Sequence, residues 1–131
     1  MAHIVIMGAG LGGMPAAYEM RDKVDKKHKV TVVSDSENFQ FVPSNPWVAV
    51  KWRERAQVEM PVRKYLERKG IEFISTGVKR VHPDQNQLEL NDGKTVNYDY
   101  LVIATGPKLA FDEIEGFGPQ GHTHSVCHID H

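Results

Sequence analysis

Hydrophobic residues near the start of the chain follow two patterns, short continuous runs and a helical repeat. The runs at 3–7 and 30–33 are apolar and rich in β-branched residues, as is typical of strands buried in a parallel sheet. Between them, a group of glycines leads into a segment that ends at about Lys23 and carries its small apolar residues on one helical face. The first third of the chain is therefore predicted to form a strand, a helix and a second, parallel strand.

The middle of the chain combines an irregular segment with a second helix. Residues 37–50 contain prolines and asparagines, which predict irregular structure, but they are too apolar for an ordinary solvated loop. A helix is expected over 60–68, with a proline near its start and Gly70 after its end. A third strand, parallel to the first two, is expected over 71–75.

The last part of the predicted fold has a different pattern. Short strands are expected at 78–82, 87–90 and 95–98, and the turn Asn91-Asp92-Gly93 joins the last two as a hairpin. Residues 101–104 return to the pattern of a buried strand. The order of elements predicts an α/β fold: a Rossmann-like βαβ sheet with a small antiparallel meander at about 78–98.

The glycine-rich loop that follows the first strand is the strongest chemical signal. It has the spacing Gly8-x-Gly10-x-x-Gly13 and opens the predicted helix. In such loops the first glycine permits a tight turn, the second lets the main chain approach a pyrophosphate, and the third lets helix and strand pack closely. The helix N-terminus adds main-chain N–H donors for the phosphates. We therefore expect a dinucleotide here; the alternative is a glycine-rich turn in an unrelated α/β protein.

The end of the second strand is the expected position of the group that holds the ribose. An acidic residue about 20 positions beyond the loop usually binds the ribose hydroxyls. By strand register Ser34 occupies that position, and Asp35 follows it. Either side chain can hydrogen bond to ribose, and the absence of a nearby basic replacement argues against a 2′-phosphate.

A second motif favours FAD over NAD. The segment Tyr100–Gly106 follows the meander, contains Ala104-Thr105-Gly106, and resembles the second fingerprint of flavoproteins that have two dinucleotide-binding domains. On this resemblance, residues 1–110 are the N-terminal part of an FAD-binding domain, and 111–131 are a linker or tail leading to a second domain that is missing. The fold class is then an incomplete two-dinucleotide-binding-domain flavoprotein.

The resemblance becomes more specific outside the glycine motifs. The segment Phe39–Val48, the turn Gly106–Leu109 and the later Ser125-Val126-Cys127 are similar to the corresponding parts of sulfide:quinone oxidoreductases. Flavocytochrome c sulfide dehydrogenases and type II NADH dehydrogenases share the more general parts and remain alternatives. So do a stand-alone nucleotide-binding module without redox activity and a structural protein that has lost its ligand. The apolar insert could serve substrate or quinone access, or simply cover the sheet.

The resemblance implies an enzyme that oxidises sulfide to sulfur or polysulfide and passes electrons through FAD to a quinone. Cys127 then matches the first of three family cysteines, and the chain has only this one cysteine. Because thiol–disulfide exchange requires a second sulfur, the part present in this chain is expected to be inactive on its own. Val42, Thr105, Gly106 and Ala110 are expected near the flavin.

The site predicted from the sequence has a cofactor-binding and a catalytic part. The cofactor-binding residues are Gly8, Ala9, Gly10, Gly12, Gly13, Ser34, Asp35, Val42, Thr105, Gly106 and Ala110, and the catalytic residue is Cys127. No metal site is predicted, because the spacing of the histidines around Cys127 matches no strong ligand pattern.

The composition of the chain limits which partners the protein is expected to bind and where in the cell it is expected to be. A formal net charge of -1 argues against nucleic acid as the main partner. No apolar run approaches the roughly 20 residues of a membrane span, and the N-terminus lacks the basic region of a signal peptide. We expect a cytoplasmic or peripheral membrane protein, whose membrane contact would come from parts absent here.

Overall fold

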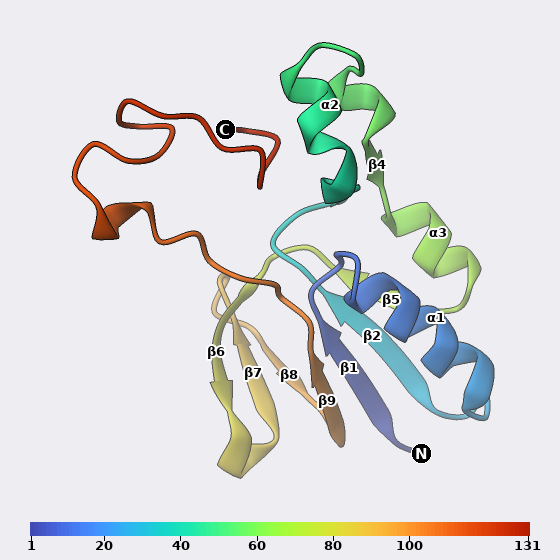
Figure 1. The fold of residues 1–131 in the computed structure, drawn as a ribbon. Helices are drawn as coiled ribbons and strands as arrows, with labels where there is room; N and C mark the ends of the chain where they lie inside the picture. Colours follow the sequence, from blue (N-terminus) through green and yellow to red (C-terminus); the bar gives the residue numbers. More distant parts are fainter. The chain divides into compact units, whose positions relative to one another are not determined.

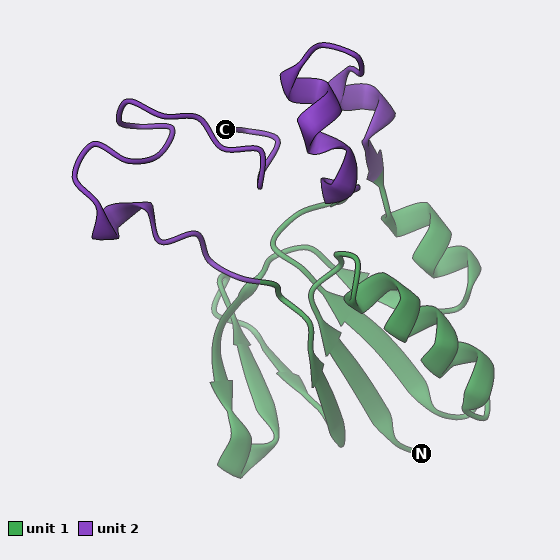
Figure 2. Cartoon of the chain, viewed as in Figure 1, with its two compact units in different colours: residues 1–39, 61–106 green, residues 40–60, 107–131 purple.

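The structure is a computed structural model that describes residues 1–131. The chain forms two compact units, residues 1–39 with 61–106 and residues 40–60 with 107–131 (Figure 2). None of the helices is long and apolar enough to cross a membrane. The predicted boundary at residue 110 stays a prediction.

A four-stranded parallel sheet forms the centre of the first unit. Its order is β5-β2-β1-β9, with β1 at His3–Met7, β2 at Lys29–Val33, β5 at Glu72–Ile74 and β9 at Tyr100–Ile103 (Figure 1). These short apolar runs pair in parallel because each connection returns the chain to the same end of the sheet: segments containing α1 and α3 lead to β2 and β5, and the meander leads to β9.

The sheet is covered on both faces. Helices α1 (Gly13–Lys23) and α3 (Arg63–Arg68) pack on one face, where Ile4 and Ile6 of β1 join a buried cluster with Leu66. The meander covers the other face, where Val5 joins a cluster with Leu88. Alternate residues of β1 therefore enter different layers of the core, as the period of two in a strand requires.

The meander consists of β6 (Val78–His82), β7 (Gln87–Leu90) and β8 (Thr95–Asn97), paired antiparallel in that order. Gly93 has a φ of 81° in the turn between β7 and β8, which confirms the hairpin predicted there.

The second unit contains little regular structure. Its first segment holds α2 (Asn45–Ala49) and its second segment is mainly loop, with a 3-10 turn at Phe111–Glu113. Strands β3 (Asn38–Gln40) and β4 (Glu59–Pro61) form a two-stranded sheet at the points where the chain passes from one unit to the other.

Two predicted elements differ from the structure. The helix expected over 60–68 begins only at Arg63, because Glu59–Pro61 pairs as β4 instead. The segment 37–50, expected to be irregular, contains β3 and α2. The late helix start and the strand β3 arise from one strand pair, and a pairing partner about 20 residues away is not visible in a local pattern. The first helix and the remaining strands are confirmed, and their observed ends differ from the predicted ends by no more than one residue.

A series of polar side-chain contacts runs across three strands of the sheet. Its central residue is Thr31, which is fully buried. The Thr31 hydroxyl donates to Oε2 of Glu72 at 2.7 Å and lies 2.7 Å from Nε2 of His3. Lys29 pairs with the same Glu72 carboxylate at 2.9 Å. The buried hydroxyl is thereby satisfied, and β1, β2 and β5 are joined by side chains as well as by the main chain.

We expect Thr31→Val to lower the free energy of unfolding by about 1–2 kcal/mol, because it removes a buried hydrogen bond while conserving volume. Urea denaturation measures this change. The control is Thr95→Val, at an exposed position in β8, which should stay within about 0.5 kcal/mol of the parent. An equal effect of the two substitutions would contradict this role of Thr31.

His3 makes the stability of this unit depend on pH. Burial, and then the charge of Lys29, lower the pKa of His3 below its ordinary value of 6.5. The unfolded chain therefore binds this proton more readily than the folded chain, so stability is fully present above about 6.5 and falls as the pH drops through the folded pKa. Between about pH 8 and pH 5, His3→Gln should lose less stability than the parent or His124→Gln, as measured by denaturant unfolding. Identical pH slopes in all three proteins would contradict the assignment.

Candidate functional site

The glycine loop follows β1 at the carboxyl end of the sheet. It contacts the ends of β2 and β9, the two strands that flank β1. The Gly8 N–H donates to the carbonyl of Val33 at 2.7 Å, which fixes the loop to the end of β2. The Ala104 N–H donates to the carbonyl of Met7 at 2.8 Å, which fixes the end of β9 to β1. The two sequence motifs, the glycine loop and Ala104-Thr105-Gly106, therefore meet at one edge of the sheet.

Two of the glycines are required by the fold itself. Gly8 has a φ of 110°, and a Cβ added there would overlap the carbonyl oxygen of Ala104. A Cβ on Gly13 would overlap the carbonyl oxygen of Gly8. Both positions admit no side chain, because loop, helix and strand meet there through the main chain.

The other two glycines face open space. A Cβ on Gly10 would meet nothing within 4 Å, and one on Gly12 would lie 3.8 Å from the Cβ of Ala104. Folding alone thus gives no reason for glycine at these positions, whereas close approach of a ligand to the main chain does. The first turn of the 11-residue helix α1 carries no acidic side chain, so nothing offsets its partial positive charge. These residues fit a pyrophosphate, and Ala9, between Gly8 and Gly10, is buried.

The candidate ribose group is at the end of β2, as expected. The Ser34 main chain is held on both sides, because its N–H donates to Ile74 at 2.9 Å and its carbonyl accepts from Gly77 at 2.8 Å. The Ser34 hydroxyl accepts from the N–H of Ser36 at 3.3 Å. Asp35 is exposed. With the Ser34 hydroxyl engaged locally, the Asp35 carboxylate is the stronger candidate acceptor.

The remaining predicted site residues are divided between the two units. Thr105 and Gly106 are exposed in the first unit, directly after β9. Val42, Ala110 and Cys127 are exposed in the second unit. The structure thus brings together the predicted residues of the loop and of the turn after β9.

An apolar pocket beside the glycine loop was missed by sequence reasoning. It has a volume of about 320 Å³ and is lined by Leu11, Met14, Pro15, Tyr18 and Phe39. The spacing of Leu11, Met14 and Tyr18 is that of one helical face, so part of this surface could have been predicted. The contribution of Phe39, which is distant in sequence, could not.

The fold and the glycine loop are those of the dinucleotide-binding class of α/β proteins. Residues 2–130 match the family of pyridine nucleotide-disulphide oxidoreductases, and the chain belongs to this family. Members of this family are flavoproteins in general.

Individual relatives confirm the resemblance seen in the sequence. The chain is 37% identical over 129 residues to the sulfide-quinone reductase of Aquifex aeolicus, covering 98% of this chain and 29% of that protein. It is 31% identical to the mitochondrial sulfide:quinone oxidoreductase of Dictyostelium discoideum, covering 86% of this chain and 25% of that protein. The chain therefore spans less than a third of the length of these relatives.

Solved structures confirm the fold class. The X-ray structure of the Aquifex aeolicus sulfide:quinone oxidoreductase superposes with a TM-score of 0.90 at 36% identity, covering 100% of this chain and 30% of that one. The NAD-dependent persulfide reductase of A. fulgidus gives a TM-score of 0.73 at 26% identity, covering 87% of this chain and 23% of that one.

The different surroundings of the glycines predict different effects of adding one methyl group. Gly13→Ala should destabilise the fold by several kcal/mol or prevent folding, because the new Cβ overlaps main-chain atoms. Gly10→Ala should leave the free energy of unfolding within about 1 kcal/mol of the parent, because the space there is open. Thermal and urea unfolding measure both effects, and equal destabilisation by the two substitutions would contradict this division.

Proposed function

We propose that this chain binds FAD through the glycine loop and forms the FAD-binding N-terminal part of a sulfide:quinone oxidoreductase. In the longer enzyme, sulfide is oxidised to sulfur or polysulfide, and its electrons pass through FAD to a quinone. Support for the reaction comes from relatives named for it, among them two at 37% and 31% identity, and from a solved structure named for it.

The observation that carries FAD binding is the meeting of two motifs at one sheet edge. The glycine loop alone suits any dinucleotide. The neighbouring strand β9 is followed by Ala104, which lies beside Gly8, and this segment resembles the second fingerprint that distinguishes flavoproteins from domains that bind only NAD. FAD supplies an acceptor that takes two electrons together and releases them singly or in pairs.

Each predicted residue has a specific task in this proposal. The N–H groups of Gly10, Gly12 and the first turn of α1 bind the pyrophosphate. Asp35 accepts hydrogen bonds from the ribose, and the preceding residue, Ser34, lies next to it. Val42, Thr105, Gly106 and Ala110 lie along the flavin half of the cofactor.

Cys127 is the proposed sulfur-reactive residue. It is the only cysteine of the chain, and it is exposed. If Cys127 forms a disulfide with a second thiol, sulfide can attack that disulfide, which breaks its S–S bond, leaves a persulfide on one sulfur and releases the other as a thiolate, so the chemistry needs the second thiol. That thiol must come from another part of the longer enzyme.

FAD titration of the chain, followed by flavin absorption and fluorescence, tests cofactor binding. We expect the parent to bind FAD and Gly10→Ala to bind it at least about tenfold more weakly, because the added methyl group blocks phosphate approach. Asp35→Asn should weaken binding less, and Asp84→Asn, an exposed carboxylate far from the loop in sequence, should not change it.

Comparison with ADP separates the alternatives. A redox flavoprotein should bind FAD more tightly than ADP, because its flavin half makes contacts of its own, whereas a plain nucleotide module should bind both equally. A longer protein that includes this chain should reduce a quinone with sulfide. Absence of bound flavin from that longer protein would contradict the proposal.

A further inference from the structure

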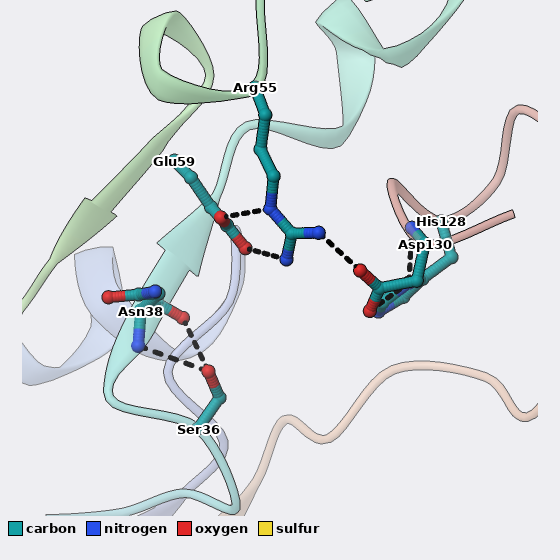
Figure 3. Close-up of polar contacts among 6 residues, drawn as sticks. All are labelled: Ser36, Asn38, Arg55, Glu59, His128 and Asp130. Carbon is teal, nitrogen blue, oxygen red and sulfur yellow. Dashed lines mark hydrogen bonds and ion pairs between the residues drawn. The ribbon is translucent and has the colours of Figure 1, made fainter.

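The second unit contains an ion-pair network that joins its two segments. Arg55, in the first segment, donates from Nε to Oε2 of Glu59 at 2.7 Å and from Nη2 to Oε1 at 3.1 Å (Figure 3). Its remaining terminal nitrogen, Nη1, donates to Oδ1 of Asp130 in the second segment. The guanidinium fork is thus divided between two carboxylates that lie on different segments.

The first segment presents Arg55 in a fixed orientation. The 3-10 turn Arg55–Gln57 is closed by a capping box, in which the N–H of Glu54 donates to Oε1 of Gln57 at 2.8 Å. The Glu59 side chain is only 17% exposed, so it holds the guanidinium from a largely buried position. A bidentate pair of this kind fixes the plane of the guanidinium and therefore the direction of its third donor.

The second segment presents Asp130 on a compact turn that begins one residue after Cys127. The N–H of Asp130 donates to Nδ1 of His128 at 3.2 Å, and the N–H of His131 donates to the carbonyl of His128 at 3.2 Å. The Cys127 N–H donates to the hydroxyl of Ser125 at 3.1 Å. Short local bonds therefore order the main chain on both sides of Cys127, which is three residues from the carboxylate that Arg55 holds.

The charges of the neighbouring side chains also favour the ion pair between Arg55 and Asp130. The hydrogen bond from Arg55, followed by the charges of Arg55, His128 and His131, lowers the pKa of Asp130, so this carboxylate is ionised at neutral pH. The Arg55–Asp130 contact is a single bond between half-exposed side chains, and such pairs contribute little in isolation; here the bidentate Arg55–Glu59 pair makes it part of a network, the arrangement in which exposed charges do contribute.

We propose that the network Glu59–Arg55–Asp130 positions the Cys127 segment by fixing it to the segment 40–60. Arg55 and Asp130 are then positioning residues: they do not touch the reacting sulfur but restrict where the thiol can lie. The purpose of this restriction rests on the proposed sulfur chemistry of Cys127, whereas the restriction itself can be measured without flavin or sulfide.

A nitroxide spin label on Cys127 tests the proposal directly, because the chain has no other thiol. In the parent chain, we expect a slow component in the electron paramagnetic resonance spectrum. Asp130→Asn should shorten the rotational correlation time of the label at least about twofold, since the neutral amide binds the guanidinium weakly. About 1 M salt should act in the same direction on the parent but not on the variant.

Three further variants make the outcome decisive. Asp130→Glu keeps a carboxylate and should restore the slow component, which distinguishes ion pairing from a general effect of substitution. Arg55→Gln should act like Asp130→Asn. Asp112→Asn, a matched exposed carboxylate in the same segment, should leave the spectrum unchanged. Circular dichroism checks that each variant is folded.

A parent spectrum without a slow component, or equal spectra for the parent, Asp130→Asn and Asp112→Asn, would overturn the proposal. Neither result depends on the cofactor, so a failure here is distinguishable from a failure of the proposed flavin binding.

Discussion

The first unit depends on one close approach of main-chain atoms at the carboxyl edge of its sheet. Gly8 lies against the ends of both β2 and β9, through its hydrogen bond to Val33 and its contact with Ala104. Gly13 lies against Gly8 in turn, which brings α1 onto the strand. Three neighbouring strands and a helix thus converge at a place that admits no side chain. The same convergence leaves Gly10 and Gly12 facing outward at the N-terminus of the helix, so the constraint that builds the fold also creates the candidate phosphate site.

The features that could be predicted from the sequence are those that depend on local backbone chemistry. The glycine loop, α1, the turn at Gly93 and the buried strands each have a signal within a few residues, and the structure agrees. The predicted start of a helix at residue 60 was wrong because β4 pairs with β3, and this pairing overrides the local pattern. Arg55 and Asp130 are 75 residues apart, so no spacing rule could have joined them.

In the candidate site, too, the features with a local sequence signal could be predicted, and those that depend on contacts between distant residues could not. Gly8 and Gly13 could be predicted as structural positions, but the open surroundings of Gly10 are known only once β9 is placed. Ser34 was expected in the acidic position, and the structure shows its hydroxyl bonded within its own loop, which directs attention to Asp35. The apolar pocket needs Phe39 beside α1, a contact between residues that are far apart in sequence.

Membership of the pyridine nucleotide-disulphide oxidoreductase family and the geometry of the loop lead to one central claim: FAD binds where the two motifs meet. Amide chemical-shift mapping by nuclear magnetic resonance during FAD titration tests this claim most directly. If FAD binds there, the largest shift changes will fall on Gly8–Gly13 and on Thr105 and Gly106, with a smaller change at Asp35. Saturable changes confined to other residues, or no changes at all, would contradict it.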